Sequence, residues 1–115
     1  MSTKTIPETI HVKGLEIGKD TPFGHVEHVE RLYPGIYWVT TPEHGGVKLD
    51  HYRNRQVPLQ HRVYGGWYEE DEMWRVPAYV FRTQLLASGN DNAIDMVKAV
   101  LKMVEDDGDA VIPLS

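Results

Sequence analysis

The chain has 115 residues, a net charge of −5 and no cysteine, so disulfides and thiolate metal sites are excluded. Its contents of 41% hydrophobic and 25% charged residues are typical of a globular protein. We therefore expect residues 1–115 to form a single domain, with residues 1–8 flexible. The first residues lack the apolar core of a signal peptide, and no run reaches the roughly 20 apolar residues of a membrane span. We expect a cytoplasmic protein without membrane contact.

The excess negative charge lies in the C-terminal part of the chain. Residues 66–115 carry ten acidic and four basic side chains, whereas residues 1–65 carry seven acidic and eight basic ones. An acidic surface repels the phosphates of nucleic acids and attracts basic protein surfaces. The alternative explanation is a solvated surface that keeps the protein soluble.

The N-terminal part of the chain has the pattern of short strands and turns. Residues 9–15 alternate weakly and predict an edge strand, and residues 18–24 predict a turn. Residues 36–41 are all β-branched or aromatic, which makes them the clearest strand. Because Pro34 and Gly35 form a turn before them, we predict an antiparallel hairpin with residues 25–33, and a further brief strand at 47–49.

The middle of the chain predicts short helices. Asp50 is a good N-cap for a helix over residues 51–56, and residues 57–66 read as a polar loop. The acids from Glu69 onward are typical of the first turn of a helix. Pro77 leaves two alternatives open, a helix that starts near it or a strand over residues 78–81. In both, we expect a core contribution from Trp74, Val76, Tyr79 and Phe81.

The last predicted element is a helix from about residue 92 to residue 106, capped by Asn90 or Asp91. Its apolar residues recur at helical spacing and form a wide stripe, which includes Ala93, Val97, Val100, Leu101 and Val104. Residues 110–114 predict a final extended segment. Together these elements predict an α+β fold, a small antiparallel sheet that includes residues 36–41 with the C-terminal helix packed on one face.

The stretch from Gly65 to Trp74 combines large aromatic side chains with four consecutive acids. Trp and Tyr are typical anchors of protein interfaces, and carboxylates attract basic partners. The three acids at the end of the last helix oppose the helix dipole, which indicates a role other than helix stability. The predicted binding residues are therefore Trp67, Tyr68, Glu69, Glu70, Asp71, Glu105, Asp106 and Asp107.

His44 follows the clearest strand and precedes two glycines. Because these glycines and Gly65-Gly66 permit close backbone contact, we predict that His44 lies close to residues 65–74. An enzyme of hydrolase type would use His44 with Glu69, Glu70 or Asp71 for proton transfer. No nucleophile, phosphate loop or metal motif accompanies these residues, so we assign no catalytic residue.

Two structural alternatives remain open. In the first, the segment around His44 and the stretch from Gly65 to Trp74 only hold loops against the core. In the second, the acidic run is braced by the basic residues Arg53, Arg55, His61 and Arg62. His25 and His28 have a spacing that suits a metal only on a helix, because a strand places them on opposite faces. We predict no metal and no cofactor.

Four blocks of the sequence resemble, in this order, a domain family of unknown function from bacteria, phages and plasmids. They are Thr21-Pro22-Phe23-Gly24, Pro34-Gly35-Ile36, Thr41-Pro42-Glu43-His44-Gly45-Gly46 and Gly66-Trp67-Tyr68-Glu69-Glu70-Asp71 with Trp74. The resemblance covers residues 21–81 and implies a mobile-element protein.

These observations lead to a hypothesis of function. We expect a small acidic interaction protein, an anti-CRISPR-like inhibitor that binds a basic surface of a host nucleic-acid-handling complex. Its partner would be a protein or nucleoprotein complex, without direct binding to nucleic acid. The sequence leaves the oligomeric state open.

Overall fold

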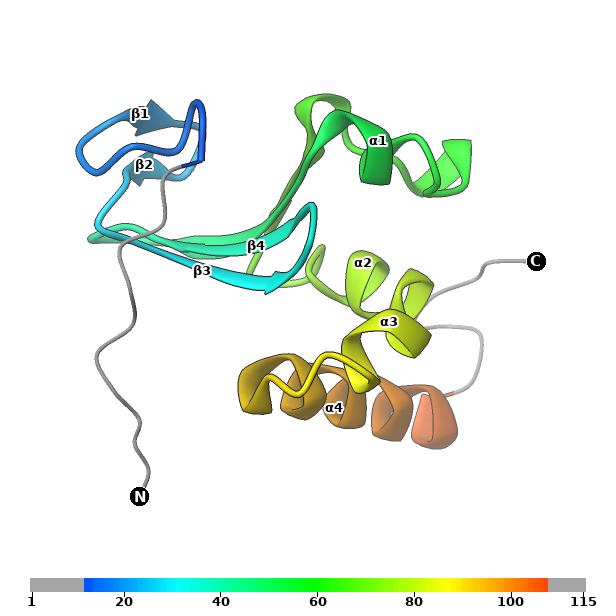
Figure 1. Cartoon of the computed structure of the whole chain (residues 1–115). Coiled ribbons are helices and arrows are strands. Elements are labelled where there is room, and N and C mark those ends of the chain that lie inside the picture. The colour runs from blue at the N-terminus through cyan, green and yellow to red at the C-terminus, as the bar shows by residue number, and fades with distance from the viewer. Residues whose placement is uncertain (1–11, 108–115) are drawn as a thin grey trace, which may run out of the picture.

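The computed structural model describes residues 12–107 (Figure 1). A four-stranded antiparallel sheet has its strands in chain order, β3 (His28–Tyr33), β4 (Ile36–Thr40), β5 (Gly45–Leu49) and β6 (Trp67–Glu69). A separate two-stranded hairpin consists of β1 (Asp20–Thr21) and β2 (Gly24–His25). The predictions for residues 1–8, 9–11 and 110–114 lie outside the described residues. The described residues 12–15 form a turn, so that part of the predicted edge strand is wrong.

Helices occupy mainly the second half of the chain. The α-helices are α1 (His51–Asn54), α2 (Arg75–Val80), α3 (Arg82–Leu86) and α4 (Asp91–Asp107), and the 3-10 helices are η1 (Leu59–His61) and η2 (Tyr64–Gly66). Helices α2–α4 lie on one side of the large sheet and the β1–β2 hairpin lies on the other (Figure 1). The predicted α+β fold is confirmed. None of the helices in residues 12–107 has the length and hydropathy that crossing a membrane requires.

The predicted hairpin is confirmed as β3 and β4, with Val29 opposite Val39. Its turn requires glycine, because Gly35 has a φ of +85° and a Cβ there would lie 2.7 Å from the Arg53 side chain. The first strand is shorter than the predicted 25–33, since His25 pairs with Asp20 in the small hairpin instead. The predicted strand at 47–49 is confirmed within β5.

Alternation along the strands divides the sheet into two faces with different cores. On the helical side, the sheet residues pack with Phe81, which lies between α2 and α3, and with helix residues such as Leu85 and Val97. The sheet residues are Leu32, Ile36, Val47, Leu49 and Tyr68. On the other side, Val29 and Val39 pack with Leu15 and Val26. The side on which a strand residue lies therefore decides which part of the protein it can reach.

The acidic run does not begin a helix, which corrects that prediction. Trp67 and Tyr68 extend the sheet as β6, residues 70–74 form a turn, and α2 begins only at Arg75. Pro77 lies in the first turn of α2, where its missing N–H costs no intrahelical hydrogen bond. The alternative strand over residues 78–81 is therefore wrong.

The C-terminal helix has nearly its predicted bounds. Asn90 is the cap, because its side-chain oxygen accepts a hydrogen bond from the Ala93 N–H at 2.9 Å. Ala93, Val97 and Val100 are buried, whereas Leu101 is 38% exposed. Leu101 thus does not belong to the buried stripe in which the sequence placed it.

Replacing Val97 with Ala should lower the free energy of unfolding by about 2 kcal/mol, because the substitution leaves a cavity in the core. Leu101→Ala is the matched control on the same helix and should cost less than about 1 kcal/mol, since its site is partly solvated. Urea unfolding followed by circular dichroism measures both. Equal stabilities of the two variants would show that α4 does not pack through Val97.

Candidate functional site

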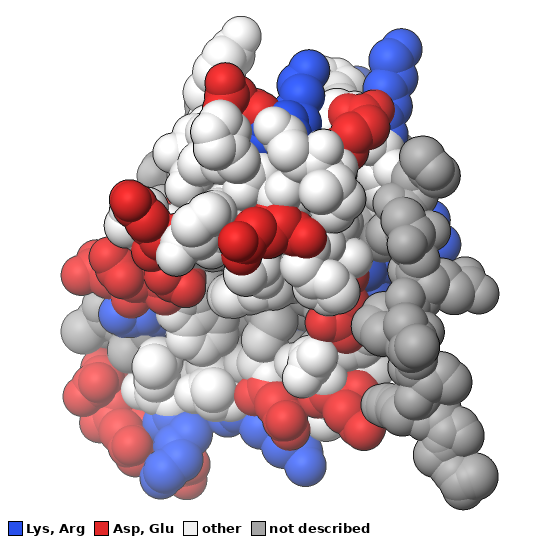
Figure 2. All heavy atoms as spheres, turned by 90° about the vertical axis from the view of Figure 1, so that its left-hand side faces the viewer, with Lys and Arg blue, Asp and Glu red and all other residues white. Residues whose placement is uncertain are grey.

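A groove of about 820 Å³ lies between the helical face of the sheet and α4. Figure 2 views the molecule from the left-hand side of Figure 1, where acidic side chains border uncharged surface and basic side chains lie along the lower edge. We call the groove between the sheet and α4 the acidic groove. It is lined by His28, Glu30, Leu32, Trp38, Thr40, Glu70, Asp71, Trp74, Asn92, Asp95, Met96 and Ala99.

The strand pairing explains why these side chains face one space. His28 lies opposite Thr40 and Glu30 lies opposite Trp38, so alternate residues of β3 and β4 share the helical face. Farther along the same face, Leu32 and Ile36 are fully buried under the helices. The groove is therefore the part of this face that α4 leaves uncovered.

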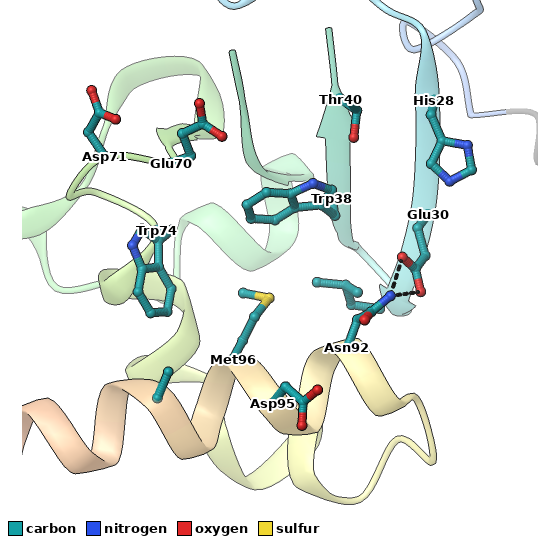
Figure 3. A pocket seen from close by; sticks show the side chains of 12 residues that line it. His28, Glu30, Trp38, Thr40, Glu70, Asp71, Trp74, Asn92, Asp95 and Met96 are labelled. Atoms are coloured by element: carbon teal, nitrogen blue, oxygen red, sulfur yellow. Dashed lines mark hydrogen bonds between the residues drawn. The ribbon is translucent and has the colours of Figure 1, made fainter.

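Glu30 connects the sheet to the start of α4. Its carboxylate accepts hydrogen bonds from the side-chain amides of Asn90, at 2.9 Å, and Asn92, at 3.0 Å. These contacts join residues about 60 positions apart in the chain and position the helix that forms one wall of the groove. Figure 3 shows the contact between Glu30 and Asn92. Glu30 thus has a structural role in addition to its charge.

The other three carboxylates of the groove, those of Glu70, Asp71 and Asp95, are exposed. Within residues 12–107 none of them has an ion-pair partner, and no Lys or Arg lines the groove. Their negative charges therefore add up over the groove and attract cations.

Large nonpolar side chains form the walls between these charges. Trp38 comes from β4, Trp74 from the turn before α2, and Met96 from α4 (Figure 3). Each is partly exposed. Indole faces attract cations and also cover aliphatic side chains, so the groove can take a ligand that is both basic and apolar.

His44 lies beside the acidic turn, as predicted. Its Nδ1 is 3.9 Å from Oε2 of Glu69, and both side chains are nearly half exposed. The Thr41 hydroxyl accepts a hydrogen bond from the His44 N–H and lies within hydrogen-bond distance of two carbonyl oxygens. The nearby depression holds only about 170 Å³ and includes Glu70. Because Thr41 is occupied by the backbone, it does not supply a nucleophile for this pair.

The close approach of these segments depends on Gly46. A Cβ at this position would lie 2.3 Å from the Tyr68 carbonyl oxygen and 2.8 Å from the Phe23 ring. No other residue fits between β6 and the small hairpin. The sequence-based argument from the glycines is thereby confirmed.

The two aromatic residues predicted as anchors are used inside the protein. Tyr68 is fully buried, so it cannot contact a partner. Its hydroxyl donates to Oδ1 of Asn54 and accepts from the Val63 N–H. Trp67 points to the opposite face, where its ring lies 5.2 Å from the Phe23 ring and 5.0 Å from Nζ of Lys48. Neither residue lines the acidic groove. β6 places Tyr68 on the helical face of the sheet, where it is buried, and Trp67 on the opposite face, against the small hairpin.

Burial raises the pKa of the Tyr68 phenol above its ordinary value, and the hydrogen bond from Val63 and the charge of Arg62 oppose this shift. The neutral phenol is therefore favoured in the folded protein. The folded-state pKa lies above the unfolded one, so this contribution to stability is complete below about pH 10 and is lost as the pH rises through the folded pKa.

The remaining predicted residues lie elsewhere. Glu105, Asp106 and Asp107 are exposed at the C-terminal end of α4 and do not line the groove. Their contribution to partner binding stays a prediction.

His25 contacts Asp20 at 2.7 Å, whereas His28 lines the groove. In the described part of the chain, no group of three or more His, Asp or Glu side chains is arranged to hold a metal ion.

Among residues 12–107, no ion pair joins Arg53, Arg55 or Arg62 to the acidic run. Arg53 donates to the Pro34 carbonyl, and Arg62 donates to the carbonyls of Val57 and Arg55. Their hydrogen bonds hold the loop that follows β5 instead, which corrects that alternative.

The sequence interpretation missed Trp38, Asp95, Met96 and the strand residues of the groove. One indication was present, because neither face of the segment 25–33 is cleanly apolar. A polar position on the core side of a strand is typical of a face that is only partly covered.

The chain matches the family described as a domain of unknown function (DUF7007) over residues 16–107, and it belongs to this family. The expected membership in a domain family of unknown function is confirmed, and the match extends beyond residues 21–81 to include α4. No significant match was found among the curated proteins or the solved structures.

Replacing Tyr68 with Phe should lower the free energy of unfolding by about 1–3 kcal/mol, because Asn54 and the Val63 N–H lose a buried hydrogen-bond partner. Tyr64, which is 99% exposed, provides the control, and Tyr64→Phe should leave stability unchanged. Denaturant unfolding compares the two. A Tyr68→Phe variant as stable as the parent would contradict the proposed role of the hydroxyl.

Proposed function

We propose that this protein is a small acidic interaction protein whose acidic groove binds a basic segment of a partner protein. The observation that carries the proposal is the composition of the groove, four carboxylates around two tryptophans without a Lys or Arg among its described lining residues. The proposal keeps the partner class that the sequence indicated and moves the binding site from Trp67 and Tyr68 to the groove.

The charges favour Arg or Lys in the ligand. Glu70, Asp71 and Asp95 have no ion-pair partner among the described residues, so a bound cation replaces solvent without breaking an internal pair. An arginine gains more than a lysine, because its planar guanidinium can pair with a carboxylate and stack on an indole.

The nonpolar walls favour a peptide segment over a small cation. A volume of about 820 Å³ exceeds one arginine side chain and lies within the range of ligand pockets. The partly exposed faces of Trp38, Trp74 and Met96 can cover an apolar neighbour of the basic residue. A protein surface that alternates basic and apolar residues meets both demands.

The concrete form of the proposal is an inhibitor. A basic segment in the channel of a nucleic-acid-handling complex normally binds DNA or RNA, and an acidic protein that occupies it prevents that binding. A phage or another mobile element would use this inhibitor in the cytoplasm of its host, as a counter-defence of the anti-CRISPR type. The acidic composition of residues 66–115 supports this form.

A hydrolase-like activity is the second candidate, favoured by the 3.9 Å distance between His44 and Glu69. Direct proton transfer between them requires a closer approach, of about 2.6–3.2 Å, or one bridging water. Only His44 of the pair lines the small depression nearby, and the described residues provide no activated nucleophile there, which favours the binding function.

The probe for the proposed function is a fluorescent peptide of alternating Arg and Leu, with a peptide of alternating Glu and Leu as the ligand control. The full chain should bind only the basic peptide, in fluorescence anisotropy at about 0.15 M salt. Replacing Glu70, Asp71 and Asp95 with neutral amides should weaken binding about fivefold or more, because three attractive charges are lost.

The matched control removes the same charge outside the groove, by neutral amides at Glu105, Asp106 and Asp107. It should change affinity less than about twofold, since charges farther than about 8 Å from the ligand are screened at this salt concentration. Equal losses in the two triple variants would show that binding depends on net charge alone and not on the groove.

A further inference from the structure

The end of the molecule formed by residues 48–66 has a charge opposite to that of the rest. This range carries four Lys or Arg and one Asp, a charge of +3, whereas the remaining residues carry −8. It contains α1, η1 and η2, and Figure 1 shows α1 at the end away from the β1–β2 hairpin. We call it the basic end.

Three of its four Lys and Arg side chains, those of Lys48, Arg53 and Arg62, have structural partners. Arg53 donates to the Pro34 carbonyl and lies over the rings of Tyr33 and Phe81. Lys48 donates to the Gly65 carbonyl at 2.6 Å and lies over Trp67. These two cations hold the basic end in place.

His51, Arg55 and Arg62 line a pocket of about 380 Å³, which also includes Lys48 and Tyr64. Hydrogen bonds from Nε and Nη2 to the Val57 carbonyl fix the guanidinium of Arg62. His51 and Arg55 are exposed and have no ion pair among the described residues. No Asp or Glu lines the pocket in the described part of the chain.

Large nonpolar side chains on this end are left in solvent. Tyr64, at the pocket, is 99% exposed, Tyr52 is 61% exposed and Leu59 is 75% exposed. Sites for single-stranded nucleic acids combine aromatic rings, on which bases stack, with cations, which neutralise phosphates. The exposed ring of Tyr64 beside Arg55 and Arg62 provides this combination.

We infer that the basic end binds single-stranded nucleic acid, with one nucleotide in the pocket. Its base stacks on Tyr64, and its phosphate lies among His51, Arg55 and Arg62. Stacking requires a free base face, which a duplex does not offer. This site goes beyond the proposed function, and it revises the expectation of no nucleic-acid binding, which rested on the charge of the C-terminal half.

The test uses the full chain and fluorescein-labelled strands of about 12 uridines or thymidines, a length within the range that single-strand binding sites cover. Anisotropy at low salt should show saturable binding. Raising the salt from about 0.05 M to about 0.2 M should weaken it roughly sevenfold if two phosphates are neutralised. Tyr64→Ala and Arg55→Gln should each weaken binding about fivefold or more.

The control variants are Leu86→Ala, another exposed apolar residue, and Lys98→Gln, an exposed cation on α4. Both should bind like the parent. Absence of saturable binding at low salt, or equal losses in Lys98→Gln and Arg55→Gln, would overturn the inference. A thermal unfolding curve unchanged by Tyr64→Ala confirms that the loss is local.

Three further measurements identify other occupants. Uridine monophosphate that binds as tightly as the strand would show that the ligand is a free nucleotide. Binding to phosphatidylserine vesicles that Tyr64→Ala abolishes would show a membrane surface. A dimer that Arg55→Gln dissociates in sedimentation would show a second copy, whose acidic groove has the complementary charge. Each of these results would overturn the assignment to a nucleic-acid strand.

Discussion

The phenol of Tyr68 joins three parts of the chain that are separate in sequence. Its ring lies in the core opposite Val47, and its hydroxyl connects α1 at Asn54 with the backbone of Val63. Glu70 and Asp71 of the acidic groove follow it closely in the chain, and the basic end stops just before Trp67. The acidic groove and the basic end therefore both depend on the buried side chain of Tyr68, and a substitution of Tyr68 would disturb both.

Local patterns predicted the elements whose partners are close in sequence. The hairpin of β3 and β4 follows from β-branched and aromatic residues around Pro34-Gly35, and α4 follows from its apolar spacing and Asn90. The proximity of His44 to the acidic turn was also predictable, because the two glycines after His44 permit close backbone contact, and Gly46 in β5 indeed lies against the Tyr68 carbonyl.

The groove was not predictable in the same way, because its walls come from residues far apart in the chain. Glu30 meets Asn92 only after the sheet and α4 are assembled, and no local pattern records this contact. Trp67 and Tyr68 were misjudged for a related reason. Adjacent aromatics look alike in a sequence, and only the strand pairing shows that one reaches the core and the other the small hairpin.

The cap of α4 is also part of the groove. Asn90 accepts the helix hydrogen bond from Ala93 with its amide oxygen and donates to Glu30 with its amide nitrogen. A cation that draws the Glu30 carboxylate toward itself therefore competes for the group that orients the cap. Occupancy of the groove should then change the fraying of the first turn of α4, so amide hydrogen exchange at Ala93 and Ile94 reports a bound ligand without any label.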